Sequence, residues 1–285
     1  MTVPADYLTL LDALGLGREA VVALVGGGGK TSTMFRLARE AAMDGRRVLA
    51  TTTARMKMEE LSPMRDVLLW DERDPTGNTW HTCRDEGTHS PWIESALVGK
   101  HDDSHIAAAF LGRTRMRDKL LGLPPEHLGE LLGRLTWDVV VVEADGSRGR
   151  SIKGHRIGEP ILPLCATHVV IVLGADGLES PLTDQCCHRP EVIQDLTGIS
   201  WGERLSAPKI VELLCHPRGL LAKIPGDMEV LIYVNKCPLG SERAAARGFA
   251  RGILRRCGGR VRRVAVGDNM QGGIVETYLP ESEAS

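Results

Sequence analysis

A loop of four glycines followed by a lysine and a threonine has the composition of a phosphate-binding site. The apolar run Val21–Val25 reads as a buried strand before this loop, and the helical pattern Thr31–Met43 follows it. Because glycine lacks a Cβ atom, its backbone can curl until successive N–H groups point at one anion, beside the partial positive charge of a helix N-terminus. Lys30 would reach the β- and γ-phosphates of a nucleotide, and the Thr31 hydroxyl would bind Mg²⁺. The candidate nucleotide-binding residues of this loop are Gly26, Gly27, Gly28, Gly29, Lys30, Thr31 and Ser32.

The spacing within the loop differs from the common phosphate loop, which has a glycine six residues before its lysine. That position holds Leu24, so the chain has a shorter G-x-x-G-K-T pattern, which also occurs in ATP-dependent ligases. A glycine-rich structural turn with an ordinary surface lysine is the alternative. A dinucleotide-binding loop fits less well, because Thr31 stands where a glycine is needed and the next strand ends in threonines rather than in an acidic residue.

Two carboxylates and a group of cationic side chains follow the most apolar predicted strand, Val139–Val142. Glu143 and Asp145 are candidates for holding Mg²⁺ or orienting an attacking water, and an aspartate capping a turn is the alternative for Asp145. Arg148 could neutralise charge that builds on a transferring phosphoryl group, so Lys30, Asp145 and Arg148 form the candidate catalytic set. A solvated basic loop is the alternative for Arg148 and for its cationic neighbours Arg150, Lys153, His155 and Arg156.

Two further strand ends carry polar side chains. Thr52, in the run Thr51–Thr53, is a candidate metal ligand beside Thr31, Glu143 and Asp145, and a plain strand terminus is the alternative. Asn235 and Lys236 are similar to the start of the guanine-reading N-K-x-D element, but Pro238 stands at the aspartate position and cannot read a base edge. We therefore expect Asn235 beside a base, with ATP and GTP both left open.

Seven cysteines are spread over the chain without a C-x-x-C pair, which argues against a zinc ribbon or a thioredoxin-like motif. We expect free and mostly buried thiols, as is usual in a reducing compartment. The adjacent Cys186 and Cys187, followed by His188, leave open a site for a soft ligand such as a chalcogen or a metal.

Composition bounds the class of protein. The chain has 285 residues, of which 42% are hydrophobic, and its net charge of −2 provides no global field for nucleic acid or membrane. No apolar run approaches the roughly 20 residues that span a bilayer, and the first 18 residues lack the pattern of a signal peptide. We expect a cytoplasmic protein with no nucleic-acid and no membrane partner.

The alternation of apolar strands with helical segments predicts an α/β protein. We expect a three-layer, P-loop NTPase-like fold with a mostly parallel sheet and helices on both faces. The whole chain, 1–285, is expected to form one domain, with a variable polar insertion at about 71–118 and a basic C-terminal segment at about 242–285. Arginines spaced four residues apart in that segment predict a basic stripe on one helix, either solvated or facing an acidic protein: Arg243, Arg247, Arg251 and Arg255.

Five elements, taken in order along the chain, resemble those of the YqeC-type family, accessory proteins of selenium-dependent molybdenum hydroxylases. They are Val25–Ser32, Ala50–Met56, Lys119–Pro124, Val141–His155 and His188–Glu191. The resemblance implies a P-loop fold and a role in maturing a molybdenum hydroxylase or in handling its cofactor.

Together these observations predict a nucleotide-binding protein with Mg²⁺ and ATP or GTP as cofactors. The first hypothesis is an NTP-hydrolysing maturation factor whose partner is a client molybdenum hydroxylase or its cofactor. The second is an ATP-dependent ligase or kinase acting on a small selenium- or molybdopterin-linked substrate. The third is a cofactor-binding module without turnover. The sequence leaves a homodimer open.

Overall fold

The chain is described here by a computed structural model. The structure describes residues 8–61, 66–70, 80–82, 108–112, 114–116, 119–133, 137–238, 242–270 and 274–280. Most of the segment predicted as a polar insertion, about 71–118, lies outside these residues.

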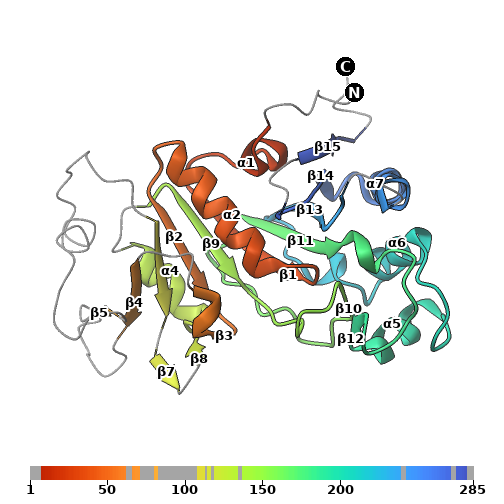
Figure 1. The fold of residues 1–285 in the computed structure, drawn as a ribbon, viewed down its shortest axis with the longest axis horizontal. Helices are drawn as coiled ribbons and strands as arrows, with labels where there is room; N and C mark the ends of the chain where they lie inside the picture. Colours follow the sequence, from red (N-terminus) through yellow and green to blue (C-terminus); the bar gives the residue numbers. More distant parts are fainter. Residues whose placement is uncertain are drawn as a thin grey trace.

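A ten-stranded sheet in the order β15-β14-β13-β11-β1-β9-β2-β6-β4-β5 forms the centre of the molecule (Figure 1). Its strands pair in parallel, except for the two antiparallel edge pairs β14–β15 and β4–β5. The strands of the sheet are β1 (Ala20–Gly26), β2 (Val48–Thr52), β4 (Asp66–Trp70), β5 (Trp80–Thr82), β6 (Ala108–Gly112), β9 (Val139–Glu143), β11 (His168–Gly174), β13 (Glu229–Asn235), β14 (Val261–Gly267) and β15 (Ile274–Tyr278).

Helices cover both faces of this sheet, and Figure 1 shows α2 in front of it with α4 behind. Alternate residues of β1 point to opposite faces, so Val22 and Leu24 pack with α1 and α2, whereas Ala23 and Val25 pack with α5, α6 and α7. The helix α4 covers Val140 and Val142 of β9 on that second face. The helices are α1 (Leu10–Leu14), α2 (Lys30–Met43), α4 (Pro125–Gly133), α5 (Pro190–Thr197), α6 (Ala207–Cys215) and α7 (Glu242–Cys257).

Shorter elements surround the carboxyl end of the sheet. Two small sheets accompany the main one, β10–β12 and β3–β8–β7. Their strands and the short helical turns are β3 (Arg55–Lys57), η1 (Met58–Leu61), β7 (Thr114–Met116), β8 (Lys119–Leu121), β10 (Ile152–Lys153), η2 (Ala175–Gly177), β12 (Cys187–His188) and η3 (Leu221–Lys223).

The central position of β1 decides where a site can form. β1 lies between β9 and β11 and pairs in parallel with both. The chain leaves β1 toward β2 on one side, and it later continues from β9 across β1 to β11 and β13 on the other side. This reversal of direction leaves a crevice beyond the carboxyl ends of the strands, where open α/β sheets bind ligands. The glycine loop begins at this point.

The predicted mixed α/β class and the mostly parallel sheet are confirmed. The strands predicted at Val21–Val25 and Val139–Val142 and the helix predicted at Thr31–Met43 recur with bounds shifted by no more than one residue. The predicted insertion at about 71–118 includes too many residues, because it contains β6. This strand lies inside the sheet and pairs with β2 and β4. Its five residues lie next to a polar segment and are too short to show a period. The prediction also missed α1, α5, α6 and the edge strand β15.

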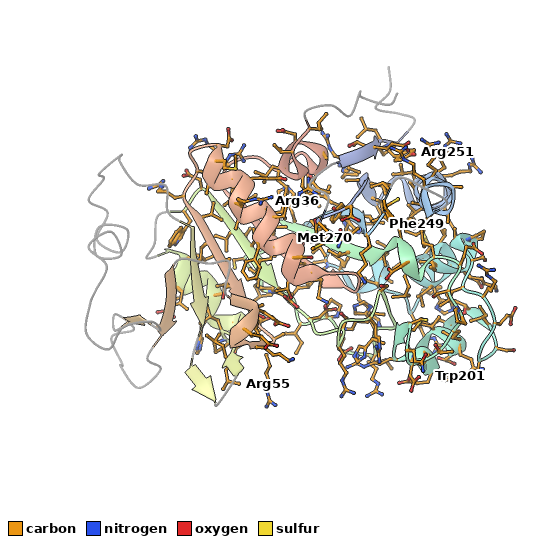
Figure 2. All side chains as sticks on the ribbon, viewed as in Figure 1. Arg36, Arg55, Trp201, Phe249, Arg251 and Met270 are labelled. Carbon is orange, nitrogen blue, oxygen red and sulfur yellow. A yellow bond between two sulfur atoms is a disulfide. The ribbon has the colours of Figure 1, made fainter. Side chains whose placement is uncertain are left out.

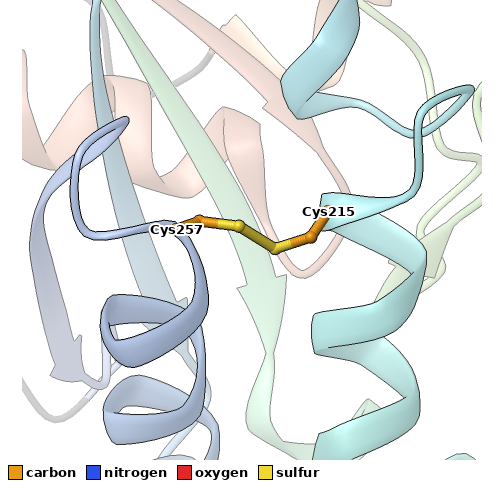
Figure 3. Close-up of a disulfide and its surroundings, with 2 residues drawn as sticks. All are labelled: Cys215 and Cys257. Carbon is orange, nitrogen blue, oxygen red and sulfur yellow. A yellow bond between two sulfur atoms is a disulfide. The ribbon is translucent and has the colours of Figure 1, made fainter.

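The expectation of free thiols is wrong for two of the cysteines. Cys215 and Cys257 form a disulfide that joins the last residue of α6 to the last residue of α7 (Figure 3). The two residues are 42 positions apart in sequence, so no local pattern announces the pair. Among the described residues, the cysteines that form no disulfide are Cys165, Cys186, Cys187 and Cys237.

The arginine stripe lies on a helix as predicted. On α7, Arg251 is exposed and Phe249 is fully buried, and Figure 2 shows both side chains. The stripe is therefore the outer face of an amphipathic helix whose other face packs on the sheet.

Candidate functional site

The glycine loop is folded tightly between the loops that follow β9 and β11. Gly28 has a φ of +69°, and a Cβ atom built on it would lie 2.1 Å from the backbone nitrogen of Gly174. A Cβ atom on Gly27 would lie 2.5 Å from the carbonyl oxygen of Arg150. Glycine is needed at both positions, because any side chain would displace the neighbouring backbone.

The first three amides of the loop are used inside the protein. Gly26 donates its N–H to Asp145 Oδ2 at 3.1 Å, and Gly28 donates to the Arg150 carbonyl at 2.9 Å. Gly27 donates to the Val172 carbonyl, also at 2.9 Å. In this conformation three of the four glycine amides are therefore bonded within the protein, and their binding of a nucleotide stays a prediction. Within the described residues, no hydrogen bond uses the N–H groups of Gly29, the N-cap of α2, and of the first three residues of α2, Lys30, Thr31 and Ser32.

Lys30 and Asp145 form a buried ion pair beneath the loop. Lys30 Nζ lies 3.1 Å from Asp145 Oδ1 and also donates to the Gly26 carbonyl at 2.7 Å. The other carboxylate oxygen, Asp145 Oδ2, lies 2.8 Å from Lys153 Nζ and 2.8 Å from His155 Nε2. All four side chains are almost completely buried. Asp145 thus contacts three basic side chains, and the ammonium group of the loop lysine lies inside the protein.

The charges of this cluster change the ionisation of its members. Burial alone would raise the pKa of Asp145, but Lys30, His155 and Lys153 together hold the pKa of its carboxyl well below the usual range. Burial lowers the pKa of His155 despite its contact with Asp145, and burial likewise lowers the pKa of Lys153. At neutral pH the cluster therefore contains an ionised carboxylate and an uncharged imidazole.

A second pair of residues joins α2 to the neighbouring strand end. Thr31 Oγ1 donates to Glu143 Oε2 at 2.7 Å, and Glu143 is the last residue of β9. Burial raises the pKa of Glu143, although Lys30 opposes this shift. A hydroxyl and a carboxylate at this distance offer the hard oxygen ligands that Mg²⁺ prefers.

The side chain of Thr52 shapes the loop after β2. Its hydroxyl accepts the N–H of Ala54 at 2.9 Å and donates to the Glu143 carbonyl at 3.0 Å. Thr52 is fully buried, so its visible role is to join the ends of β2 and β9.

Asn235, the last residue of β13, holds the glycine loop through a hydrogen bond. Its amide nitrogen donates to the Gly28 carbonyl at 2.6 Å, and its side-chain oxygen accepts the N–H of Asn269 at 3.0 Å. Asn269 in turn donates to Ser32 Oγ at 3.0 Å. The amide of Asn235 is thus engaged with the backbone of the chain. The sequence analysis missed Asn269, although its position just after the apolar strand β14 marks it as a strand-end residue.

A cavity of about 750 Å³ opens next to this cluster. It extends from Pro125 at the start of α4 to Pro190 at the start of α5, and Asp145 and Lys153 form part of its wall. Five basic side chains and a histidine line it: Arg148, Arg150, Lys153, Arg156, Arg189 and His188. The cavity thus brings the cationic residues after β9 together with the His188–Glu191 element, 40 residues further along the chain.

The adjacent residues Cys186 and Cys187 are poorly suited to bind a metal. Cys187 is buried, and burial raises the pKa of its thiol to about 12. A thiol in that state is a poor ligand, because metals bind the thiolate. In the part of the chain that the structure describes, no group of three or more His, Cys, Asp or Glu residues is placed to hold a metal ion.

None of the described helices has the length and apolar character needed to cross a bilayer.

Comparison with known proteins places the site within a matched region. A family model described as "YqeC protein" matches residues 22–191. An Escherichia coli (strain K12) protein named "Uncharacterized protein YqeC" is 31% identical over 221 residues, which is 77% of each chain. The family match spans the glycine loop and every residue that lines the cavity, whereas Asn235 and Asn269 lie beyond it.

Proposed function

The chain belongs to the YqeC family, and we propose that it is a P-loop protein that binds a nucleoside triphosphate at the glycine loop and hydrolyses it. The observation that carries the proposal is the hydrogen bond between Thr31 and Glu143 at 2.7 Å. It links the residue after the loop lysine to an acidic residue at the end of the adjacent strand. This arrangement supports a site for a nucleotide with its Mg²⁺.

The residues of the loop have separate roles in this proposal. The unused N–H groups of residues 29–32 and the ammonium group of Lys30 bind the phosphates. Thr31 and Glu143 would hold Mg²⁺, which would supply positive charge to offset the negative charge of the phosphates. Thr52 and Asp145 are not assigned to the metal, because the hydroxyl of Thr52 bonds to backbone and Asp145 is surrounded by basic groups. Asn235 holds the loop rather than a base.

Binding of a triphosphate would compete with the ion pair between Lys30 and Asp145. Lys30 Nζ would leave Asp145 for the phosphates, and Lys153 and His155 would continue to hold the carboxylate. Asp145 is then a positioning residue that keeps the loop closed without nucleotide. Arg148, on the following turn, stabilises the negative charge that develops on the γ-phosphoryl group when water attacks it.

Titration calorimetry with ATP and with GTP, each with and without Mg²⁺, tests the proposal. Lys30→Ala should weaken binding by about 10–100-fold, the value of a hydrogen bond to a charged group. Thr31→Val should remove the Mg²⁺ dependence, and Lys209→Ala, on the remote helix α6, should change nothing. If neither nucleotide binds the wild-type protein, the proposal is wrong. Binding without phosphate release would favour a cofactor-binding module.

The cavity favours a second candidate function, in which the γ-phosphoryl group passes to a small acceptor instead of water. The cavity and the glycine loop share Asp145, so an acceptor there would lie near the phosphates. ADP formation that depends on an added acceptor would support such a kinase or ligase, and equal turnover without an acceptor would exclude it.

We also propose a selenium-dependent molybdenum hydroxylase as the client, on the family resemblance alone. Co-purification of a tagged client hydroxylase with the wild-type chain tests the client proposal separately. The measurement is repeated with added nucleotide, to see whether nucleotide increases or decreases the amount of client that is recovered. The localisation proposed for such a role is cytoplasmic.

A further inference from the structure

We propose that the 750 Å³ cavity binds a small organic anion, with a phosphate or carboxylate group at one end and an apolar body at the other. The binding stands on the cavity itself. The role of the ligand as acceptor or cargo of the nucleotide reaction rests on the proposed function.

Among the described residues, two arginines at the cavity have no carboxylate partner. Lys153 pairs with Asp145, Arg156 with Glu191 at 2.9 Å, and Arg189 with both carboxylate oxygens of Glu159. Arg148 and Arg150 also line the cavity, and the structure gives neither an ion pair nor a side-chain hydrogen bond in the described residues. They supply up to ten N–H donors in the fork geometry that matches carboxylate and phosphate.

The charges around these arginines repel one another. Lys153 and Arg148, after burial, are the main influences that lower the pKa of His188, and Arg156 acts in the same direction on Arg189. An anion in the cavity would convert this repulsion into attraction. The gathering of basic groups thus has a physical cost that a bound anion would remove.

The backbone at the cavity is strained in two places. Arg148 has a φ of +52° and Arg189 a φ of +60°, a region that side chains other than glycine and asparagine rarely adopt. Such strain persists where the surrounding structure fixes it, and it is concentrated at binding sites. Both residues line the same cavity.

Part of the remaining wall is apolar, which sets the other half of the ligand, and carboxylates such as Asp184 complete the lining. Pro125, Pro160, Ile161, Ala54 and Ala144 line the cavity beside the arginines. Ile161 is 64% exposed, so its apolar surface is accessible to a ligand. The volume falls within the range of about 300–1,000 Å³ that is usual for small-molecule sites. These walls fit a compact ligand with a ring or short chain attached to its anionic group.

The position of the cavity connects it to the glycine loop. Arg150 lines the cavity with its side chain, while its carbonyl accepts the N–H of Gly28. Asp145 lines the cavity and contacts both Lys30 and Gly26. A ligand on the arginines would therefore lie one residue away from the groups that would bind a nucleotide.

The test uses phenyl phosphate and benzoate as probes, with benzyl alcohol as their uncharged counterpart, in calorimetric titrations of the full chain. The two acids distinguish a phosphate from a carboxylate ligand. We expect one of them to bind, and benzyl alcohol to bind at least about tenfold more weakly. The double variant Arg148→Gln/Arg150→Gln should lose at least about tenfold in affinity for the same probe. The matched control Arg251→Gln/Arg255→Gln, which removes two exposed arginines of α7, should bind as wild type.

Three results would overturn the inference. The first is that neither acid binds the wild-type chain. The second is that the Arg148→Gln/Arg150→Gln variant binds the probe with the same affinity as the wild type. The third is that only Lys30→Ala loses probe binding, which would place the probe in the glycine loop. The fate of the proposed function is read separately, by titrating ATP and GTP into the wild-type chain. Arginine-dependent probe binding without nucleotide binding would leave the cavity assigned and remove the nucleotide proposal.

Discussion

The glycine loop and the neighbouring cavity use charge in opposite ways. Beneath the loop, Lys30, Lys153 and His155 converge on Asp145 and all four side chains are buried. In the cavity, Arg148 is exposed and Arg150 half-buried, and neither has a carboxylate partner in the described residues. The charged side chains beneath the loop therefore stabilise the fold, whereas the arginines of the cavity are available to bind a ligand.

This difference separates stability from binding along a single stretch of chain. Asp145 and Arg148 are only three residues apart in the sequence. The carboxylate of Asp145 contacts several basic groups, whereas the guanidinium N–H groups of Arg148 form no hydrogen bond within the described residues. Buried charges are retained only when they are paired, because an unpaired one costs several kcal/mol. Substitutions in the two regions should therefore affect stability to different extents, and in one case with opposite sign.

The largest effect is expected for Asp145→Asn. This change leaves Lys30 and Lys153 buried without a counter-charge, so the free energy of unfolding should fall by about 3–5 kcal/mol at pH 7. Asp184→Asn removes an exposed carboxylate from the cavity wall and should change it by less than about 0.5 kcal/mol. Urea unfolding followed by circular dichroism measures both values. Similar values for the two variants would mean that the comparison between loop and cavity is wrong.

The pH dependence sharpens the same prediction. The pKa of Asp145 is lower in the folded chain than the ordinary value of about 3.9 in the unfolded chain. Between those two values the unfolded chain binds a proton that the folded chain does not, so stability decreases as the pH falls. The contribution is fully present above about pH 5 and is lost on acidification below it. The gap between wild type and Asp145→Asn should therefore narrow below about pH 4, and a constant gap would contradict the assigned ion pairs.

A smaller decrease in the free energy of unfolding is expected when a side chain is added to the glycine loop. Gly28→Ala places a side chain at a φ of +69° and 2.1 Å from Gly174, so we expect a loss of about 2–5 kcal/mol from conformational strain and crowding together. Gly45→Ala is the matched control, because Gly45 has a φ of +71° and nothing within 4 Å. It should cost only the conformational part, about 1–2 kcal/mol. Equal losses in thermal or urea unfolding would mean that the loop is not packed as tightly as the structure describes.

The sequence predicted the strand-loop-helix unit correctly because its signals are local. The apolar run of β1, the glycines and the amphipathic pattern of α2 each span a few neighbouring residues. The same applies to β9 and its terminal Glu143. The parallel sheet follows from these units, since long apolar strands separated by helices must be covered on both faces.

The partners of the loop amides were not predictable in this way. Gly28 bonds to the carbonyl of Arg150 and its own carbonyl accepts from Asn235, contacts that span more than 100 residues. A glycine-rich pattern states that the backbone can approach something closely, but not what it approaches. The sequence suggested an anion, whereas in this conformation the loop contacts the protein. The disulfide between Cys215 and Cys257 escaped prediction for the same reason, because only the fold brings the ends of α6 and α7 together.

The smallest expected effect is the most specific to the cavity, because its sign is reversed. Arg148→Gly relieves the strain of a non-glycine residue with a positive φ, and it removes a positive charge that has no carboxylate partner within the described part of the chain. We expect these two gains in stability to exceed the loss caused by the greater conformational entropy of glycine in the unfolded chain. The free energy of unfolding should therefore stay constant or rise, by up to about 1 kcal/mol. Arg251→Gly, in the middle of α7, should instead lower it by about 1 kcal/mol, the cost of glycine in an exposed helix interior. If both variants are destabilised alike in urea unfolding, Arg148 contributes to folding, and the division between a structural loop and a binding cavity fails at its boundary. If the signs differ, the chain retains at Arg148 a residue that its own stability does not require, as expected of a side chain kept for a ligand.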